Sequence, residues 1–397
     1  MKLHTRAVHA GDRKRNPADA GSVPATTPIY TASSYFYNDI DQLDRVFASE
    51  MPGQSYARYG NPTNDALEEL VASLESGAGA LACSSGMSAV HMAVNAAVAD
   101  RRRVVLAANA LYGATLNMLA KVLEPAGIET IFLDFCDEAA VRDAIAEHRP
   151  GALLMETISN PLLRVPALDR IAGMARDAGA ALIVDNTFAT PLMVRPIELG
   201  ATFTVHSLTK FLSGHGDVLG GAVVADEENL HPLRMLSRTL GFGLGPFEAY
   251  LSMRGIKTFA VRMERQCANA CRVASWLAGH PAVERVYFPA DPKHPDAENI
   301  RRLFPQNLFG AMISFDLKDA GRERVFRVMN ALRMIVPSTS LGDVHTMMLY
   351  PAMSSHRDIS PKHRARLGIG DSLLRVSIGI EAVEDIIADL EQALSAK

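Results

Sequence analysis

Short apolar segments alternate with amphipathic stretches from about residue 80 to residue 225, and this alternation constrains the fold more than any other feature of the sequence. The apolar segments are short and are bounded by small and polar residues, which indicates strands. Strands separated by amphipathic helical segments form a mainly parallel sheet with helices on both faces. We therefore predict an α/β domain with a mainly parallel, seven-stranded sheet. The predicted strands are 80–83, 104–108, 129–133, 152–156, 181–185, 201–206 and 220–225.

The sequence on either side of this region has a different character. Residues 1–60 are rich in proline, tyrosine and turn-forming residues and show little periodicity, so we expect an arm that lies over another surface. After residue 250, long helical stretches and two strand-like segments, 311–317 and 374–380, predict a smaller α+β domain. The expected organisation is an N-terminal arm contacting a neighbouring subunit (1–60), a large domain (61–250) and a C-terminal domain (251–397).

Composition and charge argue against several classes of partner. The formal net charge of −4 and the isoelectric point near 6.3 give no basic excess that attracts nucleic acid or anionic lipid. The four cysteines form no Cys-x-x-Cys pair and have no histidine cluster at zinc spacing, so no metal site is predicted. No apolar run approaches the ~20 residues of a membrane span, and the first residues lack the apolar core of a signal peptide. We expect a cytoplasmic protein.

The strongest local signal for chemistry is Ser207-Leu208-Thr209-Lys210, which ends a predicted strand and precedes a glycine-rich turn. Hydroxyl groups close to a lysine suit a site that holds a phosphate beside a reactive amine. A lysine in such a place can be desolvated, which lowers its pKa and favours the neutral amine that forms a Schiff base with an aldehyde. The alternative interpretation is a surface lysine in a flexible loop.

Two further segments end at the same edge of the predicted sheet. Asp185 ends one strand, and a carboxylate there is costly to bury unless a cation such as a protonated pyridine nitrogen pairs with it. The segment 83–94 turns at Gly86 into a helix, whose free N–H groups can bind a phosphate. A helix-capping aspartate and an ordinary structural turn are the alternatives. Ligands of open α/β sheets bind beyond the carboxyl ends of the strands, where we expect several strand-ending residues to line one crevice. These residues are Ser84, Asn109, Asp134, Glu156, Asp185 and His206.

Eight ordered motifs in this chain resemble one known family, the Cys/Met-metabolism family of pyridoxal phosphate enzymes. That family comprises cystathionine γ-synthase, cystathionine γ- and β-lyases, methionine γ-lyase and the O-acylhomoserine sulfhydrylases. The resemblance runs in family order from about residue 8 to residue 390. The motifs are YARYGNPT (56–63), SSGM (84–87), LYGAT (111–115), ETISNP (156–161), VDNTFATP (184–191), SLTK with SGHGD (207–217), MRGIKTF (253–259) and LRVSIGIE (374–381).

The resemblance implies a fold of the aspartate-aminotransferase type, pyridoxal 5′-phosphate as the cofactor, and a homotetramer of two tight dimers that share active sites. It implies that Lys210 is the Schiff-base lysine and that Asp185 is the partner of the pyridine nitrogen. Tyr112 would stack on the ring and exchange a proton with the departing group. The residues implied to hold the phosphate are Ser207, Thr209, Gly86 and Met87, together with Tyr56 and Arg58 of the neighbouring subunit. The resemblance also implies a catalytic role for Tyr56. The residues implied to bind the substrate are Arg375, which clamps the carboxylate, and Asn160, the backbone of Ser340, and Thr339.

A few positions bear on which reaction of the family this chain performs. The Ser-Leu-Gly-Asp segment 340–343 resembles methionine γ-lyases, and Thr339 stands where cystathionine-handling γ-enzymes usually carry glutamate. Ala114, however, stands where methionine γ-lyases typically have cysteine. We predict γ-elimination from methionine, homocysteine or a similar amino acid, giving a 2-oxo acid, ammonia and a thiol. The alternatives are cystathionine γ-synthase, O-acylhomoserine sulfhydrylase or cystathionine γ-lyase activity, and a leaving group bonded through oxygen.

Two other classes of protein agree less well with the sequence. A catalytically silent protein on the same fold is expected to lack the lysine, the aspartate or the tyrosines of the motifs, and all of them are present. A nicotinamide-dependent dehydrogenase is expected to carry Gly-x-Gly-x-x-Gly after its first strand, and that pattern is missing here.

Overall fold

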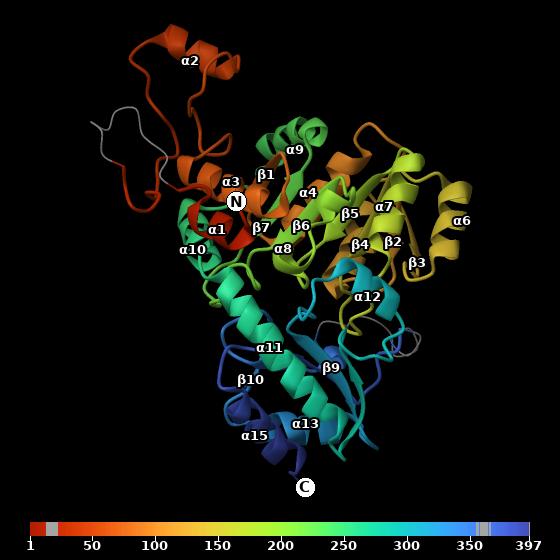
Figure 1. Cartoon of the computed structure of the whole chain (residues 1–397). Helices are drawn as coiled ribbons and strands as arrows, with labels where there is room; N and C mark the ends of the chain where they lie inside the picture. Colours follow the sequence, from red (N-terminus) through yellow and green to blue (C-terminus); the bar gives the residue numbers. More distant parts are fainter. Residues whose placement is uncertain (13–22, 355–356, 358–363, 365–366, 397) are drawn as a thin grey trace.

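A seven-stranded sheet lies at the centre of the protein, whose computed structural model describes residues 1–12, 23–354, 357, 364 and 367–396. The strand order is β1-β7-β6-β5-β4-β2-β3 (Figure 1). β7 runs antiparallel to both neighbours, and the other pairs are parallel. The predicted mainly parallel sheet is therefore confirmed. The strands are β1 (Gly79–Cys83), β2 (Val104–Ala108), β3 (Glu129–Leu133), β4 (Ala152–Glu156), β5 (Ala181–Asp185), β6 (Phe203–Ser207) and β7 (Gly221–Ala225).

Helices cover both faces of this sheet, as the buried, apolar strands require. Successive residues of a strand point to opposite faces. In β6, Ser207 lies beside Gly86 of α4, whereas His206 contacts Glu75 of α3. These contacts place α4 and α3 on opposite faces. The helical segments of this part are α3 (Pro62–Glu75), α4 (Gly86–Val98), α5 (Gly113–Met118), η1 (Leu119–Leu123), α6 (Glu138–His148), α7 (Leu168–Asp177), α8 (Thr190–Met193), η2 (Pro196–Leu199), α9 (Glu227–Leu240) and α10 (Pro246–Ile256).

A second sheet of five strands forms the C-terminal part, in the order β10-β11-β12-β9-β8. β10 and β11 pair in parallel, and the other pairs are antiparallel. The predicted smaller α+β unit is present. Its elements are α11 (Phe259–Ala278), β8 (Val283–Tyr287), α12 (Ala297–Leu303), β9 (Met312–Leu317), α13 (Arg322–Ala331), β10 (Val336–Pro337), β11 (Met347–Leu349), η3 (Pro351–Met353), β12 (Leu373–Ser377) and α15 (Val383–Leu394).

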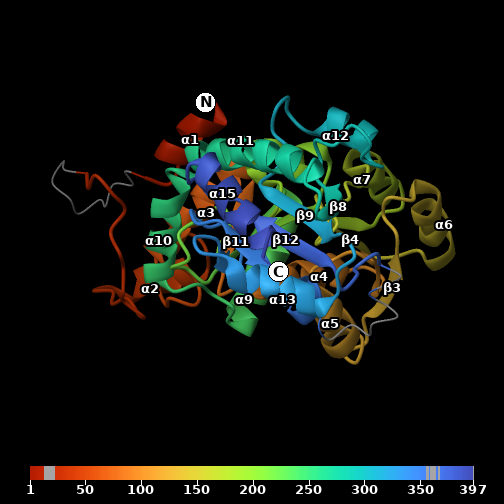
Figure 2. The same ribbon diagram turned by 90° about the horizontal axis from the view of Figure 1, so that it is seen from below.

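The long helix α11 joins the two parts of the molecule (Figures 1 and 2). Its first half contributes Met263 and Cys267 to the hydrophobic core of the large sheet. Its second half contributes Ala270 and Leu277 to a separate core beneath the second sheet. One helix shared between two cores holds the two sheets in a fixed relation, which the site between them requires. The domain boundary placed near residue 250 stays a prediction.

The N-terminal segment is partly packed and partly extended. The helix α1 (Leu3–His9) buries Leu3 and Ala7 against the body of the protein. In contrast, α2 (Ile40–Phe47) has no buried residue and projects from the body (Figure 1), and Phe36 before it is 99 % exposed. Residues 13–22 of the expected arm lie outside the described residues. Contact of the arm with a neighbouring subunit stays a prediction. No helix within the described ranges is long and apolar enough to cross a membrane.

Candidate active site

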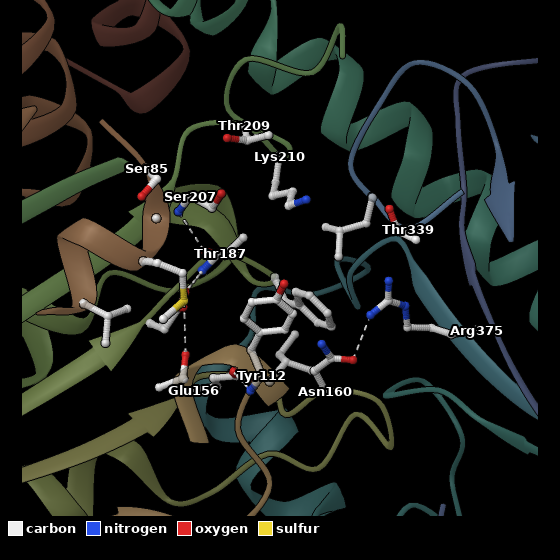
Figure 3. A pocket seen from close by; sticks show the side chains of 18 of the residues that line it. Ser85, Tyr112, Glu156, Asn160, Thr187, Ser207, Thr209, Lys210, Thr339 and Arg375 are labelled. Atoms are coloured by element: carbon white, nitrogen blue, oxygen red, sulfur yellow. Dashed lines mark hydrogen bonds between the residues drawn. The ribbon is translucent and has the colours of Figure 1, made fainter. Parts of the chain in front are cut away.

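A cavity of about 400 Å³ lies beyond the carboxyl ends of β4, β5 and β6, and it brings most of the predicted site residues together (Figure 3). Open α/β sheets bind ligands at this edge, and a concave site of this size suits a small molecule. The predicted residues that line it are Gly86, Met87, Tyr112, Asn160, Asp185, Ser207, Thr209, Lys210, Thr339 and Arg375.

Lys210 follows β6 and extends into the cavity (Figure 3). Its Nζ donates a hydrogen bond to Oγ of Ser340 at 2.9 Å, so the predicted residue Ser340 reaches the site through its hydroxyl. Burial, together with the positive charge of Arg375, lowers the pKa of Lys210 to about 8. This lower pKa increases the share of the neutral amine near neutral pH. A neutral, desolvated amine is the form that acts as a nucleophile or a base.

Asp185, the last residue of β5, faces the cavity with its carboxylate. Its Oδ1 accepts the N–H of Thr187 at 2.9 Å, and it forms no ion pair with any residue in the described part of the chain. Burial raises the pKa of Asp185, although hydrogen bonds from Thr187 and the nearby His206 oppose this effect. An enclosed carboxylate of this kind is costly unless a ligand brings a cation to it.

One end of the cavity is built to receive an anion. Ser85 caps α4 and forms a capping box with Ser88, whose N–H donates to the Ser85 hydroxyl. The N–H groups of Gly86 and Met87 belong to the first turn and have no partner within the helix. The helix thus begins at Gly86, where an added Cβ would lie 2.9 Å from the Cβ of Ser207. Only glycine lets the backbone approach β6 this closely. Figure 3 shows Ser85, Ser207 and Thr209 together at this end, and such a helix start with hydroxyl groups suits a phosphate.

The opposite end of the cavity carries Arg375, from the middle of β12 (Figure 3). Its Nη1 donates to Oδ1 of Asn160 at 2.8 Å, and the side chain is only 2 % exposed. Burial lowers the pKa of Arg375 to about 10. Its Nε has no hydrogen-bond partner among the described residues. A guanidinium held by one amide and with an unsatisfied donor suits a carboxylate ligand.

Tyr112 lies at the middle of the cavity (Figure 3), and Glu156 contacts its backbone. The N–H of Tyr112 donates to Oε1 of Glu156 at 2.6 Å, immediately before the start of α5. Glu156 was predicted only as one of several strand-ending residues, and Thr187 was not predicted at all. Both line the cavity. The signals in the sequence were the position of Glu156 at the end of an apolar strand and the motifs ETISNP (156–161) and VDNTFATP (184–191), which contain Glu156 and Thr187.

The other strand-ending polar residues lie elsewhere. A second cavity of about 150 Å³ borders the first, and Asn109 and Asp134 line it. Glu156 and Asn160 line both cavities and so stand between them. His206 points into the interior, where it contacts Glu75. The single crevice that we expected is therefore two adjoining cavities.

Tyr56 and Arg58 do not line the cavity of their own chain. The Arg58 guanidinium lies 4.8 Å from the centre of the Tyr59 ring and donates to the carbonyl oxygen of Arg238. Tyr56 is 46 % exposed. The prediction that both residues act in a neighbouring subunit stays a prediction.

The residues of the cavity match the chemical groups of pyridoxal phosphate. The helix start suits a phosphate, Lys210 supplies an amine for an aldehyde, and Asp185 is a carboxylate that lacks a cation. No group of three or more histidine, cysteine, aspartate or glutamate side chains that could hold a metal occurs in the parts of the chain that the structure describes. This fold and this site define a pyridoxal-phosphate-dependent enzyme.

Comparisons with known proteins agree with this class. The family model described as Cys/Met metabolism PLP-dependent enzyme matches residues 4–395, and the chain belongs to this family. It is 40 % identical to an L-methionine gamma-lyase of Fusobacterium nucleatum subsp. polymorphum, covering 99 % of this chain and 98 % of the relative. It is 38 % identical to an O-succinylhomoserine sulfhydrylase of Pseudomonas aeruginosa, covering 99 % and 95 %. The structure of a cystathionine gamma synthase from Xanthomonas oryzae pv. oryzae is similar, with a TM-score of 0.91, 36 % identity and coverage of 100 % and 98 %.

Proposed function

We propose that the protein catalyses γ-elimination from methionine, homocysteine or a similar γ-substituted amino acid, giving a 2-oxo acid, ammonia and a thiol. The observation that carries this proposal is the uncharged lining of the cavity outside its reactive groups. The ionisable acidic and basic side chains among its described lining residues, tyrosine aside, are Glu156, Asp185, Lys210 and Arg375. The uncharged ones include Val90, Ile158, Phe188, Leu219, Thr339 and Leu341.

The distribution of charge favours a small sulfur-containing substituent on the γ-carbon. Arg375 is placed to bind the α-carboxylate, while Lys210 and Asp185 serve the cofactor. In Figure 3, Glu156 lies beside Tyr112 and away from Thr339. Among the described residues that line the cavity, no charge is then left to bind a second aminocarboxylate, such as the distal end of cystathionine. A thiomethyl or thiol group can pack there against uncharged side chains without desolvating a charge.

The mechanism follows from what each side chain can do. Pyridoxal phosphate, when bound, supplies an aldehyde for the substrate amine and a ring that draws electrons from the α-carbon. We propose that Asp185 keeps the ring nitrogen protonated and that Lys210, as a neutral amine, takes the α-proton. Arg375 and Asn160 would hold the substrate carboxylate. Tyr112 would give a proton to the departing sulfur.

We propose that the phosphate binds to Ser207, Thr209 and the N–H groups of Gly86 and Met87. We further propose that Tyr56 and Arg58 complete this site from a neighbouring subunit, within a homotetramer. The exposed apolar residues around α2 support an assembly because an isolated chain leaves them in water. A cytoplasmic location is part of the same proposal, in keeping with an enzyme of amino-acid metabolism.

γ-Replacement is the second candidate function, and one observation favours it. A named sulfhydrylase resembles this chain almost as closely as a named methionine lyase does, at 38 % against 40 % identity. Both reactions need the same acid and base groups and differ in whether a thiol attacks the substrate after the γ-group leaves.

A steady-state assay of the purified enzyme separates the two candidates. We expect 2-oxobutanoate to form from methionine or homocysteine without any added thiol, because elimination needs only water after the thiol departs. Cystathionine and O-acetyl- or O-succinylhomoserine, with and without a thiol, are the comparison substrates. Turnover that requires an acylhomoserine and a thiol, and that yields a thioether, would replace the lyase proposal by the second candidate.

Arg375→Lys tests the assignment of the substrate carboxylate. Lysine keeps the charge but cannot offer two parallel donors, so a charge-assisted hydrogen bond is lost. Such a bond contributes about 1.5–3 kcal/mol, which predicts a KM raised by about 10–100-fold. Cofactor affinity, followed by absorbance, serves as the control because Arg375 lies at the opposite end from the phosphate site. A KM within about twofold of the wild type contradicts the assignment.

A further inference from the structure

Two carboxyl groups end neighbouring strands at the wall of the cavity. Glu156 and Asp185 are the last residues of β4 and β5, and their Cα atoms are paired in the parallel register. Residues paired in this way point to the same face of a sheet. Two enclosed carboxylates that lie side by side repel each other, which favours a state in which one of the pair is protonated and the other is ionised.

The surroundings of Glu156 disfavour its charge. The residue is 8 % exposed, and its Oε1 accepts the N–H of Tyr112. The charged groups that act on it are Asp185 of β5 and Arg375 of β12. Burial, and next the negative charge of Asp185, raise the pKa of Glu156 well above its usual value. Arg375 and the N–H groups of Tyr112 and Asn160 offset this effect only in part.

The surroundings of Asp185 favour its charge by comparison. Its carboxylate accepts the N–H of Thr187 and has the imidazole of His206 nearby. It also faces the place proposed for the cationic ring nitrogen, and a cation next to a carboxylate favours the ionised form.

We propose that Glu156 is a positioning residue that works as a neutral carboxylic acid, keeping the proton so that Asp185 carries the one negative charge opposite the ring nitrogen. The carbonyl oxygen of the acid accepts the N–H of Tyr112 and fixes the backbone from which the tyrosine ring enters the cavity. With Asn160, Glu156 also separates the two cavities. This inference concerns the cofactor site and does not depend on which substrate the enzyme cleaves.

The pH dependence of stability tests the proton on Glu156. The unfolded chain releases this proton above a pH of about 4.3, whereas the folded protein keeps it, so the wild type loses stability as the pH rises towards the folded pKa. Glu156→Gln keeps the acceptor oxygen and is neutral at every pH. We expect the unfolding constant of the cofactor-free wild type to rise relative to that of E156Q by about tenfold per pH unit from about pH 5 upward. The unfolding constants are measured by urea unfolding at each pH. If they change with pH in the same way for the wild type and E156Q, the proposal is wrong.

Infrared difference spectra of the holoenzyme identify which carboxyl holds the proton. Subtracting the spectrum of E156Q from that of the wild type is expected to leave the C=O band of a protonated carboxylic acid. Asp185→Asn is the matched control, since the same subtraction should leave the bands of an ionised carboxylate. If the protonated band appears for D185N and the ionised bands appear for E156Q, the assignment is reversed and the proposal is wrong.

Discussion

Lys210→Ala is expected to lower kcat by about 10²–10⁴-fold, the usual contribution of a well-placed acid–base group. Lys210 is the only lysine among the described residues that line the cavity, and its pKa of about 8 makes the neutral amine available near neutral pH. Alanine removes the group proposed to take the α-proton and leaves the phosphate site in place. The measurement is the formation of 2-oxo acid at saturating substrate and cofactor.

Lys210→Arg is the matched control for this prediction. Arginine keeps the positive charge and much of the volume but stays protonated, so it cannot act as the base. We expect K210R to be about as slow as K210A. A K210R variant that retains more than about a tenth of the wild-type rate would show that charge, and not proton transfer, is what the reaction requires of Lys210.

The fold was predictable because each strand of the large sheet carries its own local signal. Segments such as 152–155 and 181–184 are apolar throughout, since both faces of the sheet are covered, and they lie between amphipathic segments. The structure has β4 and β5 at these positions. The meeting of Asp185 and Lys210 in one cavity was likewise predictable, because Asp185 ends β5 and Lys210 follows β6 at the same edge of the sheet. Topology alone brings such residues together.

Contacts between distant segments were not predictable in the same way. Glu75 ends a helix and His206 lies within an apolar strand, and nothing local indicates that they meet across 131 positions of sequence. The partition of the strand-ending residues into two cavities depends on Glu156 and Asn160, which line both, and Ile369 from a much later part of the chain also lines the second. Side-chain direction at a strand end also escaped prediction, because a shift of one residue reverses the face that it lines.

A buried polar network lies on the far side of the sheet from the phosphate site. Oε1 of Glu75 lies 2.5 Å from Nε2 of His206 and accepts a hydrogen bond from Nδ2 of Asn186 at 2.9 Å. Oδ1 of Asn186 accepts the hydroxyl of Thr157 at 2.8 Å. Glu75 and Asn186 are fully buried, and His206 and Thr157 are each 1 % exposed. The network thus ties α3 to the ends of β4, β5 and β6, which carry the residues of the cavity.

Glu75→Ala is expected to lower the free energy of unfolding by about 3–5 kcal/mol, because it leaves His206 buried without its polar partner. The midpoint of urea unfolding of the cofactor-free protein measures this loss. Glu75→Gln is the matched control, since it keeps an acceptor for Asn186, and we expect a smaller loss. Replacing Glu75 and His206 together with leucine should recover much of the stability, because no polar group of the pair is then left unpaired. If E75A unfolds at the wild-type midpoint, the network does not hold the strand ends that position Asp185 and Ser207.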